Sequence, residues 1–135
     1  MDAQTLTPKA WTVQAVHAFD SVCAVNPFGA LQSASELVEG AYLFEYHHGD
    51  QLALIALTRS VFAAGVQVHL QALVNVTPNL PLQYRHTMQA VENTARIWGA
   101  DVLTLCTQHA AMTAAAPRWG GAVSGAIISK ILRTH

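Results

Sequence analysis

The chain has 135 residues, a length that suits one domain with one core and leaves no room for two. Apolar residues make up 52% of the chain and charged residues only 11%, whereas an average soluble domain carries roughly 25% charged residues. Either the buried core is unusually large for this length, or part of the surface is covered by a partner. The net charge of −1 gives no basic excess to bind a phosphate backbone, which argues against a nucleic-acid partner.

The sequence contains no segment that predicts secretion or membrane insertion. Its first residues, Met1 to Gln4, do not lead from a basic region into an apolar one, as a signal peptide would. The most apolar stretch, residues 51–76, has a period of two, which is not the pattern of a membrane-spanning helix. Cys23 and Cys106 lack metal-ligand spacing and are expected to be small buried residues in a reducing compartment. We therefore expect a cytoplasmic protein with no membrane partner.

The first third of the chain predicts a short strand and two helices. Residues 4–7 suit the strand. Thr7 is expected to cap the first helix, with Pro8 at the first helical position, and the apolar spacing predicts that this helix covers residues 8–25. A second helix is expected over residues 33–38, which begin with a Ser-x-x-Glu capping box.

After these helices, the period of the apolar residues changes to two. Residues 41–46 and 51–58 predict the two strands of a hairpin around a turn at residues 48–50. Residues 65–76 give the clearest strand signal, because they alternate between two faces. We expect the apolar face to carry Val66, Val68, Leu70, Ala72, Val74 and Val76. We expect the polar face to carry Gln67, His69, Gln71 and Asn75.

The remaining elements alternate between helix and strand. In chain order we expect a loop over residues 77–81, a helix over 82–98, a strand over 101–107, a helix over 109–116 and a strand over 122–132. This order predicts one α/β (α+β) domain over residues 1–135, with a mixed sheet and helices on both of its faces.

Four segments carry a family resemblance. Residues 88–100 end a helix with the pattern Ala-x-x-x-Gly-Ala, and residues 101–105 follow as an apolar strand. Residues 118–121, Arg-Trp-Gly-Gly, stand at a turn, and residues 127–132 form a closing strand that contains a Lys. In this order the segments resemble the GNAT family of N-acetyltransferases over residues 41–132. The resemblance implies a GNAT-like, mostly antiparallel central sheet, and acetyl-CoA as the cofactor if the protein is an enzyme.

The loop that binds the cofactor in that family differs here. The family pattern is Arg/Gln-x-x-Gly-x-Gly/Ala, and the matching residues are Gln83 to Met88. Glycines at these places let backbone N–H groups approach the diphosphate at a helix N-terminus. His86 and Met88 replace the small residues and are expected to project toward the phosphates, and Pro78 and Pro81 remove two backbone donors. We therefore expect impaired backbone capture of the diphosphate and no bound cofactor.

If acetyl-CoA does bind, the resemblance assigns two groups of residues to it. The diphosphate would be faced by Gln83, Arg85 and His86. The pantetheine arm would be hydrogen-bonded by the central strand at Leu73, Val74 and Asn75.

The residues that act as general acid and general base in that family are also replaced here. The Tyr that protonates the leaving thiolate in many members corresponds to Ala116, and His109 is the candidate donor in its place. Glu45 is a candidate base that would act only through water. His69, on the polar face of the central strand, is the better candidate, and the alternative is a partly exposed histidine without a catalytic role.

No metal site is expected. His47 and His48 are neighbours on a strand, so their side chains point to opposite faces and do not share one ion. A solvated turn is the expected setting of both residues.

Two functions remain open. The first is a non-catalytic binding or assembly protein, similar to the small GNAT-like proteins encoded among phage virion genes. The shared features are a helix end at residues 95–99, a Thr-bearing strand at 104–107 and a closing segment at 123–130. Such a protein would have protein partners, in a homo-oligomer or a virion, and would act in the host cytoplasm or in the virion. The second is an acetyl-CoA-dependent N-acetyltransferase.

Overall fold

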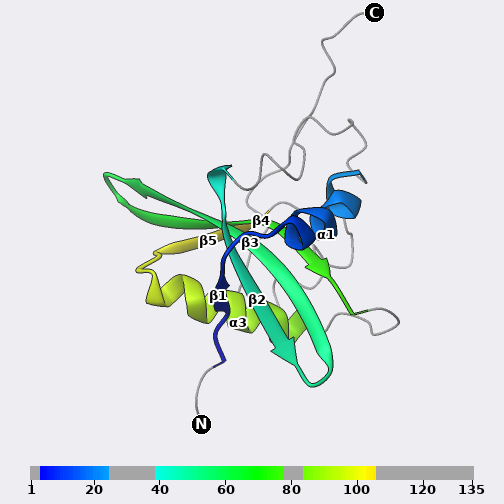
Figure 1. Ribbon diagram of the computed structural model, residues 1–135. Coiled ribbons are helices and arrows are strands. Elements are labelled where there is room, and N and C mark those ends of the chain that lie inside the picture. The colour runs from blue at the N-terminus through cyan, green and yellow to red at the C-terminus, as the bar shows by residue number, and fades with distance from the viewer. Residues whose placement is uncertain (1–3, 25–38, 78–83, 106–135) are drawn as a thin grey trace, which may run out of the picture. The chain divides into compact units, whose positions relative to one another are not determined.

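The computed structural model describes residues 4–24, 39–77 and 84–105, all within one compact unit, Met1–Leu105 (Figure 1). In chain order the elements are β1 (Thr7–Lys9), α1 (Val13–Ala24), β2 (Tyr42–His48), β3 (Gln51–Phe62), β4 (Gly65–Asn75), α3 (Tyr84–Ile97) and β5 (Val102–Leu105). The expected helices at 33–38 and 109–116 and the expected strand at 122–132 lie outside the described residues. No helix in the described part of the chain is long and apolar enough to cross a membrane.

The first helix begins later than the sequence predicted. Thr7 and Pro8 belong to β1, which pairs with β2, so Thr7 does not cap a helix. An edge strand tolerates proline because one side of the strand needs no backbone donor. Thr12 is the cap instead, since its Oγ1 accepts a hydrogen bond from the N–H of Ala15 at 3.1 Å. The helix therefore starts at Val13.

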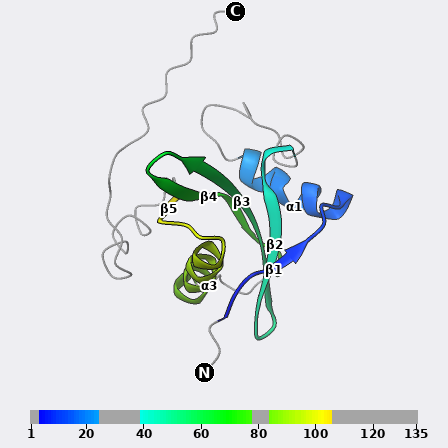
Figure 2. The same ribbon diagram turned by 90° about the vertical axis from the view of Figure 1, so that its left-hand side faces the viewer.

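The strands form one five-stranded sheet in the order β1-β2-β3-β4-β5. Neighbouring strands are antiparallel, except that β5 runs parallel to β4 because α3 connects them. The two helices α1 and α3 lie over opposite faces of this sheet (Figures 1 and 2). The expected mostly antiparallel sheet with helices on both faces is confirmed.

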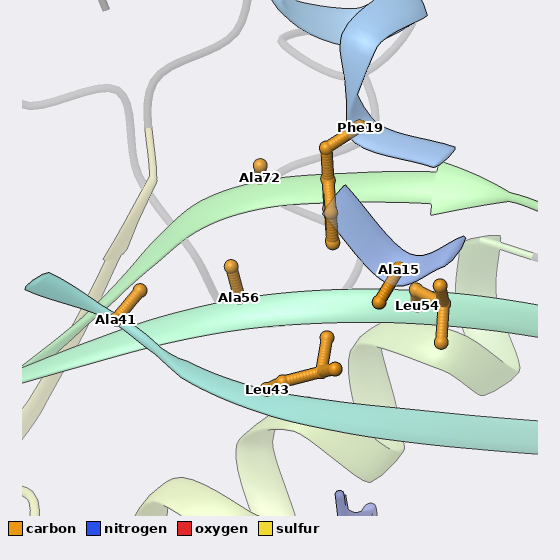
Figure 3. Packing of buried hydrophobic residues seen from close by; sticks show 7 residues of the cluster. All are labelled: Ala15, Phe19, Ala41, Leu43, Leu54, Ala56 and Ala72. Carbon is orange, nitrogen blue, oxygen red and sulfur yellow. The ribbon is translucent and has the colours of Figure 1, made fainter. Parts of the chain in front are cut away.

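Neighbouring residues of β2 show how the sheet divides the core. Leu43 belongs to a buried cluster beneath α1 (Figure 3). The members of this cluster are Ala15, Phe19, Ala41, Leu43, Leu54, Ala56 and Ala72. Phe44 points to the other face, where its ring meets that of Trp98 after α3, with the centroids 5.1 Å apart. On that face the N–H of Leu6 also donates to the buried Oγ1 of Thr94, at 2.8 Å.

The central strand β4 contains a bulge. Ala56 of β3 lies opposite Ala72, but the next residue of β3, Leu57, lies opposite Leu70. Gln71 is therefore the extra residue of β4 in this register.

The bulge exchanges the faces of β4. Before it, Val68 and Leu70 are buried on the side of α3. After it, Ala72 belongs to the cluster beneath α1, and Val74 packs against that cluster. The expectation of one apolar face over residues 66–76 is wrong, because a shift of one residue moves every following side chain to the opposite face.

Candidate functional site

The described pairing between β4 and β5 lies in the half of β4 that precedes the bulge. Four residue pairs join the two strands, and the last of them is Leu70 with Leu105. Asp101 fixes the other end of this pairing. Its N–H donates to the Val66 carbonyl at 2.8 Å, and its Oδ2 accepts from the Val66 N–H at 2.8 Å. We call this stretch, in which residues 67–70 pair with residues 102–105, the β4–β5 pairing.

Within the β4–β5 pairing, a chain of polar groups crosses from β4 to β5. Gln67 Nε2 donates to Thr104 Oγ1 at 2.9 Å, and the same oxygen lies 2.8 Å from His69 Nδ1. His69 is half-buried, and this burial lowers its pKa below the usual 6.5 because desolvation disfavours the imidazolium. The ring is therefore mostly uncharged at neutral pH. Sequence reasoning placed Gln67 beside His69 but missed Thr104, the polar residue of an otherwise apolar strand.

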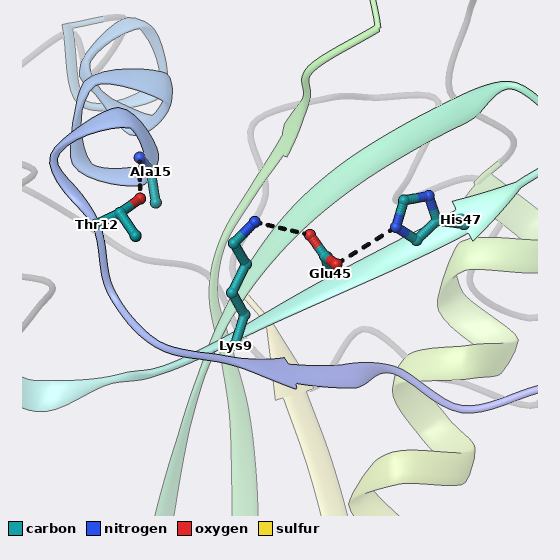
Figure 4. Close-up of polar contacts among 5 residues, drawn as sticks. All are labelled: Lys9, Thr12, Ala15, Glu45 and His47. Atoms are coloured by element: carbon teal, nitrogen blue, oxygen red, sulfur yellow. Dashed lines mark hydrogen bonds and ion pairs between the residues drawn. The ribbon is translucent and has the colours of Figure 1, made fainter.

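Glu45 lies on the same face of the sheet as His69 but at a distance from it. Its carboxylate accepts a hydrogen bond from Lys9 Nζ at 3.0 Å and lies 3.4 Å from His47 Nε2 (Figure 4). These partners, Lys9 first, hold the pKa of Glu45 below its usual 4.5. The residues of β3 opposite Glu45 and His69 are four apart, or roughly 13 Å along the strand. The structure therefore does not bring the two candidate bases together.

The first turns of α3 differ from the expectation. Arg85 and His86 are exposed. The His86 ring stacks on that of His48 at the end of β2, with the centroids 4.5 Å apart and the planes at 16°, and His48 in turn stacks with Tyr46. Met88 is only 4% exposed. The expectation that Met88 projects toward the phosphates is wrong, because the helical period turns this side chain into the core.

The candidate residues for the pantetheine arm lie in β4 beyond the bulge. Leu73 and Val74 are partly buried there, and Asn75 Oδ1 accepts a hydrogen bond from the N–H of Thr77 at 3.2 Å. Their contact with a cofactor stays a prediction.

Two further candidates, Gln83 and His109, lie outside the described residues, as do Pro78, Pro81 and Ala116. Within the described ranges, no group of three or more side chains is placed to hold a metal ion.

Solved structures identify the fold. A possible acetyltransferase from Clostridium difficile matches with a TM-score of 0.64 at 9% identity, over 98% of this chain and all (100%) of that one. A GNAT family acetyltransferase from Staphylococcus aureus matches with a TM-score of 0.56 at 11% identity, over 96% of this chain and 100% of that one. An acetyltransferase from Trypanosoma brucei matches with a TM-score of 0.54 at 13% identity, over 94% of this chain and 99% of that one.

The sequence itself gives no comparable match. No protein-family model matches it, and no curated protein does. Structural likeness at such low identity establishes the fold alone. The chain has a GNAT-like fold.

Proposed function

We propose that this chain is an acetyl-CoA-dependent N-acetyltransferase with an altered cofactor loop. The observation that carries the proposal is the setting of His69: an imidazole that is mostly uncharged at neutral pH lies on β4 and is hydrogen-bonded to Thr104 of β5. Acetyl transfer to an amine needs a group that takes a proton or polarises the thioester carbonyl, and a neutral imidazole can do either. The acetyltransferases that share the fold support this assignment.

The residues present fit acetyl-CoA in two places. Main-chain groups of Leu73 and Val74, beyond the bulge, would hold the pantetheine arm. Arg85 would face the diphosphate, since it lies in the first turn of α3, which contains no acidic residue, and both a cation and a helix N-terminus favour an anion. No glycine occurs from Thr77 to Met88, so side chains would replace a close backbone cradle. Bound there, acetyl-CoA would supply the activated acetyl group.

Titration with acetyl-CoA tests this proposal. At a hundred times the dissociation constant, the ligand should stabilise the folded chain by about 2.7 kcal/mol, measured by thermal unfolding. Arg85→Ala should weaken binding about tenfold, the loss expected for one charge-assisted hydrogen bond. Arg96→Ala is the matched control, because it removes the same charge from the last turn of the same helix. Release of the free thiol in the presence of a panel of amines then measures turnover.

A second candidate function is the non-catalytic binding or assembly protein, in a homo-oligomer or a virion. It is favoured by large apolar side chains that are exposed around the end of the sheet where α3 ends: Tyr42, Val61, Phe62, Ile97 and Val102. Few charged residues are available to keep such a surface monomeric, since they make up only 11% of the chain. This candidate expects no stabilisation by millimolar acetyl-CoA and an oligomeric mass in light scattering. A monomer that consumes acetyl-CoA would contradict it.

A further inference from the structure

Three polar side chains of β4 and β5 form a hydrogen-bonded chain whose direction has a chemical consequence. Gln67 Nε2 carries only donors, and it contacts Thr104 Oγ1 at 2.9 Å. The hydroxyl of Thr104 therefore accepts from Gln67, and it keeps one hydrogen of its own to donate. The neighbour at 2.8 Å is His69 Nδ1, which becomes the acceptor of that hydrogen.

This direction gives the Thr104 hydroxyl one hydrogen to accept and one acceptor for its own hydrogen. In the opposite arrangement, His69 Nδ1–H and Gln67 N–H would both donate to the oxygen of Thr104. The hydroxyl hydrogen would then need another acceptor, and no further contact of Thr104 occurs among the described residues. A neutral imidazole carries one proton, so an accepting Nδ1 leaves that proton on Nε2.

We propose that Gln67, acting through Thr104, keeps the ring proton of His69 on Nε2, so that His69 meets a bound acyl group as a hydrogen-bond donor and not as a general base. The second half of this statement rests on the proposed acetyltransferase function, and the first half does not. As a donor, the Nε2–H group polarises the thioester carbonyl toward attack by the amine. The C–N bond forms as the C–S bond breaks, and the proton that the amine loses ends on the leaving sulfur, so that coenzyme A departs as the free thiol. Gln67 and Thr104 are then positioning residues, which act on the reaction only through His69.

Nitrogen-15 NMR of the imidazole groups in the unliganded protein decides where the proton is. The wild-type chain should show a protonated Nε2 and an unprotonated, hydrogen-bonded Nδ1 for His69 at neutral pH. Gln67→Glu is the decisive variant, because a carboxylate can only accept: the Thr104 hydroxyl should turn to it, and the ring proton should move to Nδ1. Thr104→Val should leave a mixture of the two forms, and Thr104→Ser should restore the wild-type spectrum.

A proton on Nδ1 in the wild-type chain would overturn the proposal, whatever the variants do. The proposal would also be overturned if His69 kept the wild-type tautomer in Gln67→Glu and kept it in Thr104→Val as well. This measurement needs no turnover, so a chain that fails to bind acetyl-CoA would contradict the proposed function and leave the assignment of the proton standing.

Kinetics test the role of the donor. His69→Gln keeps an N–H donor and should retain kcat/KM within about tenfold, whereas His69→Leu should lose roughly a hundredfold or more, the effect of removing one such donor. A general base would instead make the two variants equally inactive. Equal losses in His69→Gln and His69→Leu would therefore overturn the donor role.

Discussion

The two halves of β4 are both rich in apolar residues but are built into the fold in different ways. In the first half, residues 65–70, the strand pairs with β3 and β5, and its buried apolar side chains face α3. In the second half, residues 72–75, Ala72 and Val74 face α1, and pairing with β3 is described. One extra residue, Gln71, separates them. Gln71 therefore separates a half of β4 that pairs with two strands from a half for which pairing with β3 is described.

Deletion of Gln71 should have the largest effect, because it removes the difference between the halves. Without the extra residue, either half of β4 turns its polar side chains toward the core. The expected loss of stability is on the order of 4 kcal/mol or more, at the severe end of single changes. Urea unfolding followed by circular dichroism measures it.

Gln71→Ala is the control for that deletion. It keeps the length of the strand and should cost about 1 kcal/mol or less, the contribution of one side-chain hydrogen bond. A deletion variant as stable as Gln71→Ala would show that the register adjusts without the bulge.

The fold was largely predictable from the sequence, but the bulge was not. The period of two located the strands, and the helix pattern that ends at Gly99 located α3. Alternation along residues 65–76 continues through Gln71 without interruption, so nothing in the sequence marks the change of face. Only the pairing of Leu70 and Ala72 with β3 reveals it.

The candidate site was predictable only in its separate parts. His69 stood out as a histidine on the polar face of a central strand, and the structure places it opposite Thr104 of β5. Its partner Thr104 is 35 residues away in the sequence, and the parallel register that joins them depends on tertiary packing. Met88 is buried because its place in the helical period of α3 decides the direction of its side chain, and its place in the family's loop pattern does not.

Gly65→Ala should have the next largest effect, and it probes the first half of β4. A Cβ at this position would lie 2.5 Å from Asp101 Oδ2, the atom that accepts the N–H of Val66. The carboxylate must move and the hydrogen bond is lost, so the variant should be destabilised by about 1–2 kcal/mol. Gly40→Ala is the matched control, because no atom lies within 4 Å of its added Cβ. Equal stability of the two variants in urea would show that Asp101 does not anchor β5.

Thr77→Val probes the end of the second half. The N–H of Leu52, in β3, donates to Thr77 Oγ1 at 2.6 Å, and the valine side chain has the same shape but cannot accept. The expected cost is about 1 kcal/mol, because the position is only partly buried and water can replace part of the bond. Thr77→Ser keeps the hydroxyl and should retain most of the stability. A serine variant as unstable as the valine variant would assign the effect to the lost methyl group.

Glu45→Gln should have the smallest effect. Glu45 lies in the same row of the sheet as Val74, which belongs to the second half of β4. The pKa of Glu45 is lowered, mainly by the hydrogen bond from Lys9, so its contribution to stability is present above its usual pKa of 4.5 and is lost as the pH falls through the lower folded value. Because 40% of the Lys9 side chain is exposed, the difference at pH 7 should stay below about 0.5 kcal/mol.

The stabilities of the wild type and Glu45→Gln should converge in acid. Asp20→Asn is the control: it removes a carboxylate that is 59% exposed and should change nothing at either pH. A difference between wild type and Glu45→Gln that grows toward acid would mean that Lys9 does not stabilise this carboxylate.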